Sequence, residues 1–297
     1  MIARGGGSAG SWPPPEGLSA LASSDSLRRV PTPRPRLHKG LGQHHLTSGA
    51  LTRPLIAYLA PAGRRVIEIG PGGGVLTSEL LAAGARVTAW EIDLGWTWEL
   101  RRRLRGSPLA LAAADALDLQ WSRLRQPALV AGNLPYNVAT AIVERLLPHH
   151  RQVPRAAFLV QREVAERLVA RAGDAAYGSL SVLVAAYSRP RLLGRVRRGS
   201  FRPPPKVEGA FVGLELMAPP LPEPEMGPFV VMVRGAFGQR RKMLHNSLGA
   251  MWGRGPAAAA LAEVGLPGGV RAEQVALAQW LEIYRRRPGG GGGGTDR

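Results

Sequence analysis

The chain has 297 residues, 45% of them hydrophobic, and its Lys and Arg outnumber its Asp and Glu by 39 to 21, giving a net charge of +18. This length accommodates a catalytic domain of about 200 residues and a smaller second domain. No apolar run approaches the roughly 18 consecutive residues that a membrane helix needs. We therefore expect a soluble, cytoplasmic protein without a membrane partner.

Two further features of the composition restrict the function. Cysteine is absent, which excludes disulfides, thiolate metal sites and cysteine nucleophiles, and no metal is predicted. The cationic excess favours a polyanionic partner such as nucleic acid. A high-GC genome would explain arginine in place of lysine, but it would not explain the excess of positive charge.

The two ends of the chain differ in composition from its middle. Residues 1–36 are rich in Pro, Gly, Ser and Arg and show no hydrophobic period or apolar secretory core, so we expect a disordered basic arm and no export. Residues 288–297 are predicted to form a flexible, glycine-rich tail. The middle is predicted to contain a catalytic domain at residues 37–218 and a helical RNA-binding domain at residues 219–287, with the boundary in the proline-rich stretch at 217–224.

Apolar runs typical of strands alternate with helical patterns along the first part of the chain. The predicted strands are residues 66–69, 86–90, 109–111, 128–131, 156–160, 192–196 and 210–214, and the predicted helices between them include 76–83, 140–147 and 163–170. From residue 229 onward the pattern becomes purely helical, with segments at 229–237, 240–251, 257–264 and 272–286. This order predicts an α/β fold, a doubly wound Rossmann-like sheet, followed by a small all-helical C-terminal domain.

A glycine turn follows the first predicted strand, in the segment Gly70-Pro71-Gly72-Gly73-Gly74. A dinucleotide-binding G-x-G-x-x-G motif would place its third glycine at Val75, so nicotinamide binding loses support. The methyl donor S-adenosylmethionine carries no phosphate and needs only a close approach of the backbone and a helix N-terminus near its carboxylate. The turn fits that requirement.

Two carboxylates follow the next predicted strands. Glu91 can accept hydrogen bonds from both ribose hydroxyls, and Asp115 can accept one from the adenine amino group of the cofactor. Glu91 could instead be a helix N-cap, and Asp93 is the competing acid beside it. The glycine turn and the two acids, taken in order, favour an S-adenosylmethionine site over a generic nucleotide site.

The most informative segment is Asn133-Leu134-Pro135-Tyr136, at the end of the fourth predicted strand. An adenine amine is a poor nucleophile because its lone pair is delocalised, and the Asn133 side-chain oxygen and the following backbone carbonyl can accept its two N–H groups. Pro135 fixes the turn and Tyr136 offers a ring on which an unstacked base can lie. The alternative is an ordinary strand-to-helix turn, because Asn-x-Pro is common in turns.

These motifs resemble those of the ribosomal RNA adenine dimethyltransferases, in particular the bacterial small-subunit enzymes that modify two adjacent adenosines in the 3′-terminal hairpin. The resemblance spans about residues 36–286. It is carried by the segments at residues 42–46, 68–77, 91–93, 115–117, 133–137, 161–167, 177–182, 201–207 and 239–244.

The resemblance implies a set of residue functions. The cofactor-binding residues would be His44 and Leu46, which close over the cofactor, together with Gly70, Glu91, Asp115 and Asn133. Asn133 and Tyr136, with Leu134 and Pro135 between them, would form the catalytic segment, and Phe201 would lie on the other face of the target base. The chain departs from the family pattern at His45, where Phe is usual, at Ala141, where Pro is usual, and in its aromatic segment at residues 95–98.

Basic residues form two candidate RNA contacts. Residues 189–206 contain six Arg and one Lys, no acid, and Phe201 near their centre. Cations around an aromatic ring suit a splayed base with flanking phosphates, although a solvated charged segment is the simpler interpretation. The predicted RNA-binding residues are Arg197, Arg198, Arg202, Lys206, Arg240, Arg241 and Lys242.

The predicted substrate is small-subunit ribosomal RNA within an assembling 30S subunit, with no obligate protein partner. The first alternative is a large-subunit rRNA adenine methyltransferase that confers antibiotic resistance, whose relatives usually lack the matches at residues 161–167 and 177–182. A DNA adenine methyltransferase would more often carry Pro where Leu134 stands. A third alternative is a ribosome-assembly factor in which methylation is secondary or lost.

Overall fold

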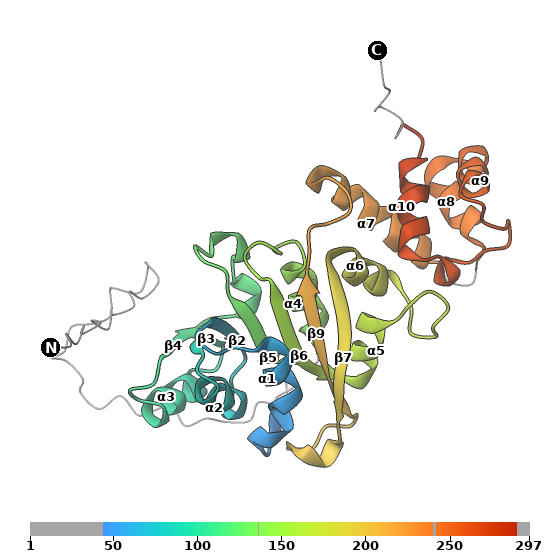
Figure 1. Ribbon diagram of the computed structural model, residues 1–297. Coiled ribbons are helices and arrows are strands. Elements are labelled where there is room, and N and C mark those ends of the chain that lie inside the picture. Colours follow the sequence, from blue (N-terminus) through green and yellow to red (C-terminus); the bar gives the residue numbers. More distant parts are fainter. Residues whose placement is uncertain (1–43, 136, 240–241, 290–297) are drawn as a thin grey trace, which may run out of the picture.

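The computed structural model describes residues 44–135, 137–239 and 242–289. The predicted arm at residues 1–36, most of the predicted tail, and Tyr136, Arg240 and Arg241 lie outside the described residues. Figure 1 shows a sheet flanked by helices, followed by a helical C-terminal part. None of the helices in the described ranges is long and apolar enough to cross a membrane.

The centre of the molecule is a seven-stranded sheet with the strand order β4-β3-β2-β5-β6-β9-β7. Its strands are β2 (Arg65–Ile69), β3 (Arg86–Glu91), β4 (Leu109–Ala113), β5 (Leu129–Asn133), β6 (Arg155–Gln161), β7 (Ser188–Val196) and β9 (Gly209–Leu216). The first five strands of this set pair in parallel, whereas β9 is antiparallel to both β6 and β7. The predicted α/β class is confirmed, with an antiparallel pair at one edge.

Helices cover both faces of the sheet (Figure 1). They are α1 (Arg53–Leu59), α2 (Val75–Ala82), α3 (Leu94–Arg103), α4 (Ala139–Leu146), α5 (Arg162–Val169) and α6 (Ser179–Tyr187). Successive strand residues point to opposite faces, so Val66 packs in the cluster of α1 and α2 while Ile67 packs in the cluster of α4, α5 and α6. This two-sided burial explains why the strands are almost continuously apolar.

The chain changes direction between two neighbouring strands at the middle of the sheet. From β2 it proceeds to β3 and β4 on one side, and β5 then begins the other side, so β2 and β5 are adjacent although far apart in sequence. Open α/β sheets bind ligands beyond the carboxyl ends of the strands at such a switch point. The loops after β2 and β5 are the glycine turn and the Asn133 segment.

The C-terminal part consists of α7 (Glu223–Phe237), α8 (Leu244–Trp252), α9 (Arg254–Glu263) and α10 (Leu277–Arg285). Its core shares one buried cluster with α6 and the sheet. Tyr177 lies at the junction, where its hydroxyl donates to the carbonyl of Val275 at 2.8 Å and its ring meets Phe237 edge-on. Strand β9 ends at Leu216 and α7 begins at Glu223, and the division of the chain at residues 217–224 stays a prediction.

Candidate active site

The glycine turn joins β2 to α2 through a left-handed backbone. Gly70 and Gly72 have φ angles of +64° and +48°, which residues other than glycine rarely adopt. A Cβ atom at Gly72 would also lie 2.3 Å from the His45 ring. Glycine is therefore required at Gly72 both by the backbone conformation and by the close approach of a second segment.

Glu91 ends β3 and faces this turn. Its side chain is only 4% exposed, and its two oxygens accept hydrogen bonds from the Gly72 N–H at 2.9 Å and the Asp93 N–H at 3.0 Å. Asp93 caps α3 by accepting from the N–H groups of Gly95 and Trp96. The sequence left open that Glu91 is a helix N-cap. In the structure Asp93 is the N-cap instead, and Glu91 contacts the glycine turn. Burial raises the pKa of Glu91 above its ordinary value.

A second buried acid was not singled out from the sequence. Glu68, in the middle of the strand preceding the turn, is 1% exposed and lines the same cavity as Glu91. Burial raises its pKa to about 8, and the neighbouring Thr77 offsets only part of that rise. Among the described residues its Oε2 atom has no hydrogen-bond partner. The sequence did contain a signal for Glu68, because it is an acid inside a predicted apolar strand that leads directly into a glycine turn.

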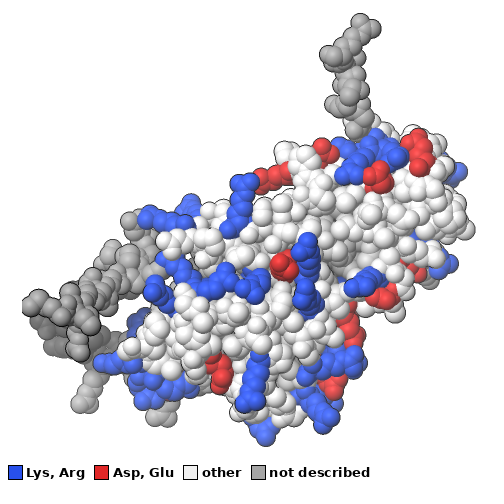
Figure 2. Space-filling model, viewed as in Figure 1, with Lys and Arg blue, Asp and Glu red and all other residues white. Residues whose placement is uncertain are grey.

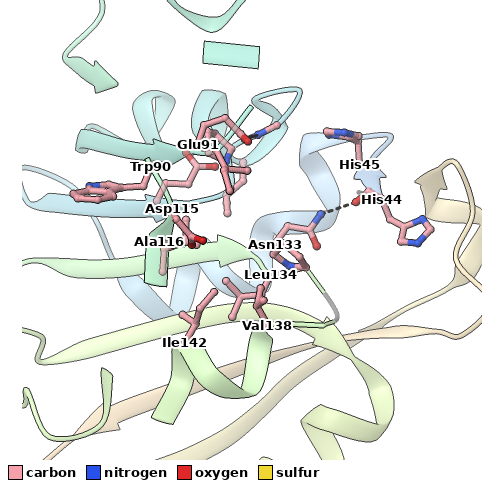
Figure 3. Close-up of a pocket in the computed structure, with 18 of the residues that line it drawn as sticks. His44, His45, Trp90, Glu91, Asp115, Ala116, Asn133, Leu134, Val138 and Ile142 are labelled. Carbon is pink, nitrogen blue, oxygen red and sulfur yellow. Dashed lines mark hydrogen bonds between the residues drawn. The ribbon is translucent and has the colours of Figure 1, made fainter. Parts of the chain in front are cut away.

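Asn133 ends β5 beside the glycine turn. The register that pairs Ile69 with Gly132 brings the following residues, Gly70 and Asn133, together, and a Cβ at Gly70 would lie 3.9 Å from the Asn133 carbonyl. The Asn133 Nδ2 donates to the carbonyl of His44 at 2.7 Å (Figure 3). This hydrogen bond orients the side-chain amide of Asn133, and its Oδ1 atom can still accept a hydrogen bond.

The residues that follow Asn133 lead into α4. Leu134 is buried, and its N–H donates to the Leu159 carbonyl of β6 at 3.0 Å. The Pro135 carbonyl accepts from the N–H groups of Val138 and Ala139 at the start of α4. The segment is therefore held at both ends, while Tyr136 lies outside the described residues.

A short segment of the N-terminal region covers the cavity. Residues 44–47, here termed the lid, contain β1 (His45–Leu46), which pairs with β8 (Phe201–Arg202) in an antiparallel, two-stranded sheet that was not predicted. The Thr47 N–H donates to the Ser200 carbonyl at 3.0 Å, and His44 Nδ1 lies 2.8 Å from the Pro203 carbonyl oxygen. Backbone pairing thus connects the lid to the arginine-rich segment.

These elements enclose a cavity of about 270 Å³. Figure 3 shows Glu91 and Asp115 on one side of the cavity and Asn133 with His44 on the other. The structure brings all six predicted cofactor-binding residues to its wall: His44, Leu46, Gly70, Glu91, Asp115 and Asn133. Asp115 accepts from the Leu117 N–H at 2.8 Å, which caps the 3-10 helix Ala116–Asp118.

The cavity wall contains acidic residues but no strongly basic ones among the described residues. Among the described residues, its lining contains the carboxyl groups of Glu68, Glu91 and Asp115 and no Lys or Arg. Trp90, Ile92 and other apolar side chains complete the wall. Such a wall disfavours phosphate groups and favours a ligand that is cationic and partly apolar.

Comparison with known proteins agrees with this geometry. The family model described as "Ribosomal RNA adenine dimethylase" matches residues 35–287. The chain belongs to the ribosomal RNA adenine dimethylase family. It is therefore a methyltransferase of ribosomal RNA adenines, as the motifs had predicted.

Relatives of this dimethylase carry a more specific name. The Ribosomal RNA small subunit methyltransferase A of Synechococcus sp. is 40% identical over 264 residues, which cover 86% of this chain and 92% of the relative. The protein of the same name from Methylococcus capsulatus is 36% identical and covers 88% of this chain and 99% of the relative.

Solved structures also share the fold of the dimethylase. A dimethyladenosine transferase from Plasmodium falciparum superposes with a TM-score of 0.70 at 22% identity, covering 81% of this chain and 96% of that one. The 23S rRNA methyltransferase ErmE gives a TM-score of 0.63 at 28% identity, covering 86% of this chain and 99% of that one.

Phe201 is placed differently from the other predicted site residues. Its side chain is 0% exposed and packs in the same buried cluster as Leu46, close to Gly209. Among the described residues it does not belong to the cavity lining. Stacking of Phe201 on a target base stays a prediction for this dimethylase.

Five of the seven predicted RNA-binding cations are among the described residues, and these five lie on the surface. Arg197, Arg198, Arg202 and Lys206 are exposed on the hairpin between β7 and β9, and Lys242 is exposed before α8. Figure 2 shows basic side chains spread over the visible face, with fewer acidic ones between them. This exposure allows contact with a large anionic partner, and the contacts themselves stay a prediction.

Proposed function

We propose that the dimethylase uses S-adenosylmethionine to dimethylate the N6 amine of two adjacent adenosines in the 3′-terminal hairpin of small-subunit (16S) rRNA, within an assembling 30S subunit. The named relatives at 40% and 36% identity support the small-subunit substrate. The observation that carries the proposal is the hydrogen bond from the Asn133 side chain to the His44 carbonyl at the wall of a cavity lined by acidic residues and no Lys or Arg among the described residues.

The cavity wall fits S-adenosylmethionine. Each carboxylate oxygen of Glu91 keeps a second lone pair for a ribose hydroxyl, although both oxygens already accept from backbone N–H groups. Asp115 and Ile92, which is 52% exposed, suit the edge and the face of an adenine ring. The Oε2 atom of Glu68, which has no hydrogen-bond partner among the described residues, offers a polar contact for the ligand at the same wall. Bound there, S-adenosylmethionine would supply an activated methyl group, because the positively charged sulfur leaves as a neutral thioether when its bond to the methyl carbon breaks.

Asn133 would act on the acceptor amine. Because its Nδ2 is held by the His44 carbonyl, its Oδ1 can accept one amine N–H, and the backbone carbonyl of Leu134 can accept the other. These acceptors favour a pyramidal nitrogen, whose lone pair is no longer delocalised into the ring. As the new N–C bond forms, the amine loses a proton to water, so no general base is needed. Tyr136 would hold the base by stacking.

The two parts of the chain would divide the work. The catalytic domain at residues 37–218 would bind cofactor and base, and the helical domain at residues 219–287 would grip rRNA with Arg240, Arg241 and Lys242. The likeness to ErmE supports a large-subunit substrate as the second candidate. The identity to the small-subunit relatives is higher, which favours the first.

Mass mapping of rRNA nucleosides from cells with and without the gene tests the proposal. We expect two adjacent dimethyladenosines to disappear from the 3′-terminal hairpin of small-subunit rRNA, while large-subunit rRNA stays unchanged. Loss of methylation from large-subunit rRNA alone would establish the second candidate instead. Purified protein supplied with free small-subunit rRNA or with immature 30S subunits then identifies the form of the substrate.

A further inference from the structure

The lid contacts the glycine turn through the side chain of His45. Its Nδ1 accepts a hydrogen bond from the Gly73 N–H at 3.0 Å. Its ring packs against Trp96 of α3, with 4.9 Å between ring centroids and an interplanar angle of 46°. The structure therefore brings His45 of the lid and Trp96 of α3 together beside Gly73.

The carbonyl of Gly73 is hydrogen-bonded by a residue of α3. Arg103 donates to the Gly73 carbonyl at 2.5 Å, and Glu91 accepts from the N–H of the preceding residue, Gly72. At Gly72 and Gly73, three side chains therefore hydrogen-bond to the backbone of the turn: Glu91 from β3, Arg103 from α3 and His45 from the lid. His45 alone among these three belongs to the lid, so opening of the lid removes one support of the turn.

We propose that His45 is a positioning residue that couples closure of the lid to the shape of the glycine turn, and that it does so only as a neutral imidazole. The inference rests on the proposed function insofar as the cavity holds S-adenosylmethionine. An Nδ1 atom that accepts must carry a lone pair, so the ring proton lies on Nε2. A second proton would place an N–H on Nδ1 against the Gly73 N–H.

The surroundings of His45 offer an imidazolium little compensation. Its Nε2 is buried and has no hydrogen-bond partner among the described residues. The charged or titratable groups around it are His44 on the lid, Glu91 at the end of β3, Asp93 before α3, Arg103 on α3, and Arg202, its cross-strand partner on β8. Glu91 and Asp93 are already engaged with backbone N–H groups, and Arg103 and Arg202 are cationic.

The sign of the pH dependence follows. Burial, and secondarily His44, lowers the pKa of His45 from its ordinary value of 6.5 when the lid is closed. The closed lid is therefore fully favoured above about pH 6.5 and loses stability as the pH falls below that value. Glu68 and Glu91 also titrate at the cavity, so the contribution of His45 must be measured by difference.

The first experiment follows the ligand-free full chain by NMR between about pH 5 and pH 8. Histidine ring resonances and the Gly73 amide are compared in the parent protein, in His45→Phe and in His245→Phe, a matched substitution on α8. We expect the Gly73 amide shift to follow the titration of His45, and to lose that titration only in His45→Phe. A Gly73 amide that responds equally in all three proteins would overturn the proposal.

The second experiment measures the dissociation constant of S-adenosylmethionine by calorimetry over the same range. One coupled proton weakens binding by up to about tenfold between about pH 7.5 and pH 5.5. His45→Phe keeps an aromatic ring against Trp96. The pH dependence of its dissociation constant for S-adenosylmethionine should be smaller by that factor, whereas His245→Phe should show the pH dependence of the parent. An unreduced dependence in His45→Phe would overturn the proposal. If S-adenosylmethionine fails to bind at any pH, the proposed function fails, and the ligand-free spectra still decide the part played by His45.

Discussion

The cofactor side and the RNA side of the site are built in different ways. On the cofactor side, buried polar groups are committed to specific partners, as Glu91 is to the Gly72 N–H and Asn133 is to the His44 carbonyl. On the RNA side, the cations of the β7–β9 hairpin are exposed, and Arg198 donates a hydrogen bond to a backbone carbonyl of the hairpin itself, that of Pro205. Methyl transfer requires fixed geometry, whereas phosphate attraction acts over a distance and tolerates mobile side chains.

The largest effect that this comparison predicts concerns Glu91. Glu91→Ala removes a buried carboxylate proposed to accept from two ribose hydroxyls, so the dissociation constant of S-adenosylmethionine should rise by about a hundredfold in calorimetry. Asp93→Ala is the matched control, because Asp93 caps α3. It should cost about 1 kcal/mol of stability and leave affinity nearly unchanged. Equal affinity losses in the two variants would contradict the assignment of Glu91.

The RNA side should respond to salt rather than to geometry. The combined Arg197→Ala, Arg198→Ala and Lys206→Ala variant should reduce the slope of log affinity against log salt by about 2, because each lost phosphate contact with a single strand contributes about 0.7. Filter binding to small-subunit rRNA fragments measures the slope. Arg101→Ala with Arg105→Ala, on and just after α3, should leave the slope as in the parent. An unchanged slope in the hairpin variant would place the RNA footprint elsewhere.

The ionisation of Glu68 shows how strongly burial affects the acidic groups on the cofactor side. Its pKa is raised to about 8 in the folded chain, against an ordinary value of 4.5. Between those values the folded chain holds a proton that the unfolded chain has lost, so stability falls as the pH rises through that window.

Glu68→Gln removes this titration. The thermal midpoint of the variant should therefore fall less between about pH 6 and pH 8.5 than that of the parent, as followed by circular dichroism. Glu163→Gln, exposed on α5, should retain the parental difference. A parental pH dependence in Glu68→Gln would show that Glu68 is not protonated at neutral pH.

Phe201 lies where the two sides meet, and the expected effect there is the smallest. Phe201→Leu should cost about 1 kcal/mol of stability in urea unfolding, since the side chain is buried in a packed cluster. If the ring also stacks on the target base, the turnover number should fall further than this loss of stability explains. Turnover equal to that of the parent in the folded variant would leave Phe201 a core residue only.

The sequence predicted the sheet better than the connections. The strands were predicted from apolar runs because strands buried on both faces are almost continuously apolar. The helices α1, α3 and α6 were not predicted. In α3 three arginines and two tryptophans mask the apolar face. In α6 seven of the nine residues are buried, so no amphipathic period is present.

The site shows the same limit. Gly70, Glu91, Asp115 and Asn133 could be placed at one edge because they follow parallel strands, whose ends meet there. The pairing of His45 with Arg202 across 157 positions depends on tertiary structure and has no local pattern. Glu68 was missed because its importance comes from burial, which a strand pattern interrupted by one acid does not quantify.

The most direct test of the account is the rate of methyl transfer by Asn133→Ala in a single turnover with saturating S-adenosylmethionine and rRNA. Removing an acceptor that acts mainly in the transition state should lower the rate by about a hundredfold or more while RNA affinity stays within about twofold. Gln126→Ala, an exposed carboxamide just before the opposite end of β5, should transfer methyl at the parental rate. A parental rate in Asn133→Ala would contradict the account.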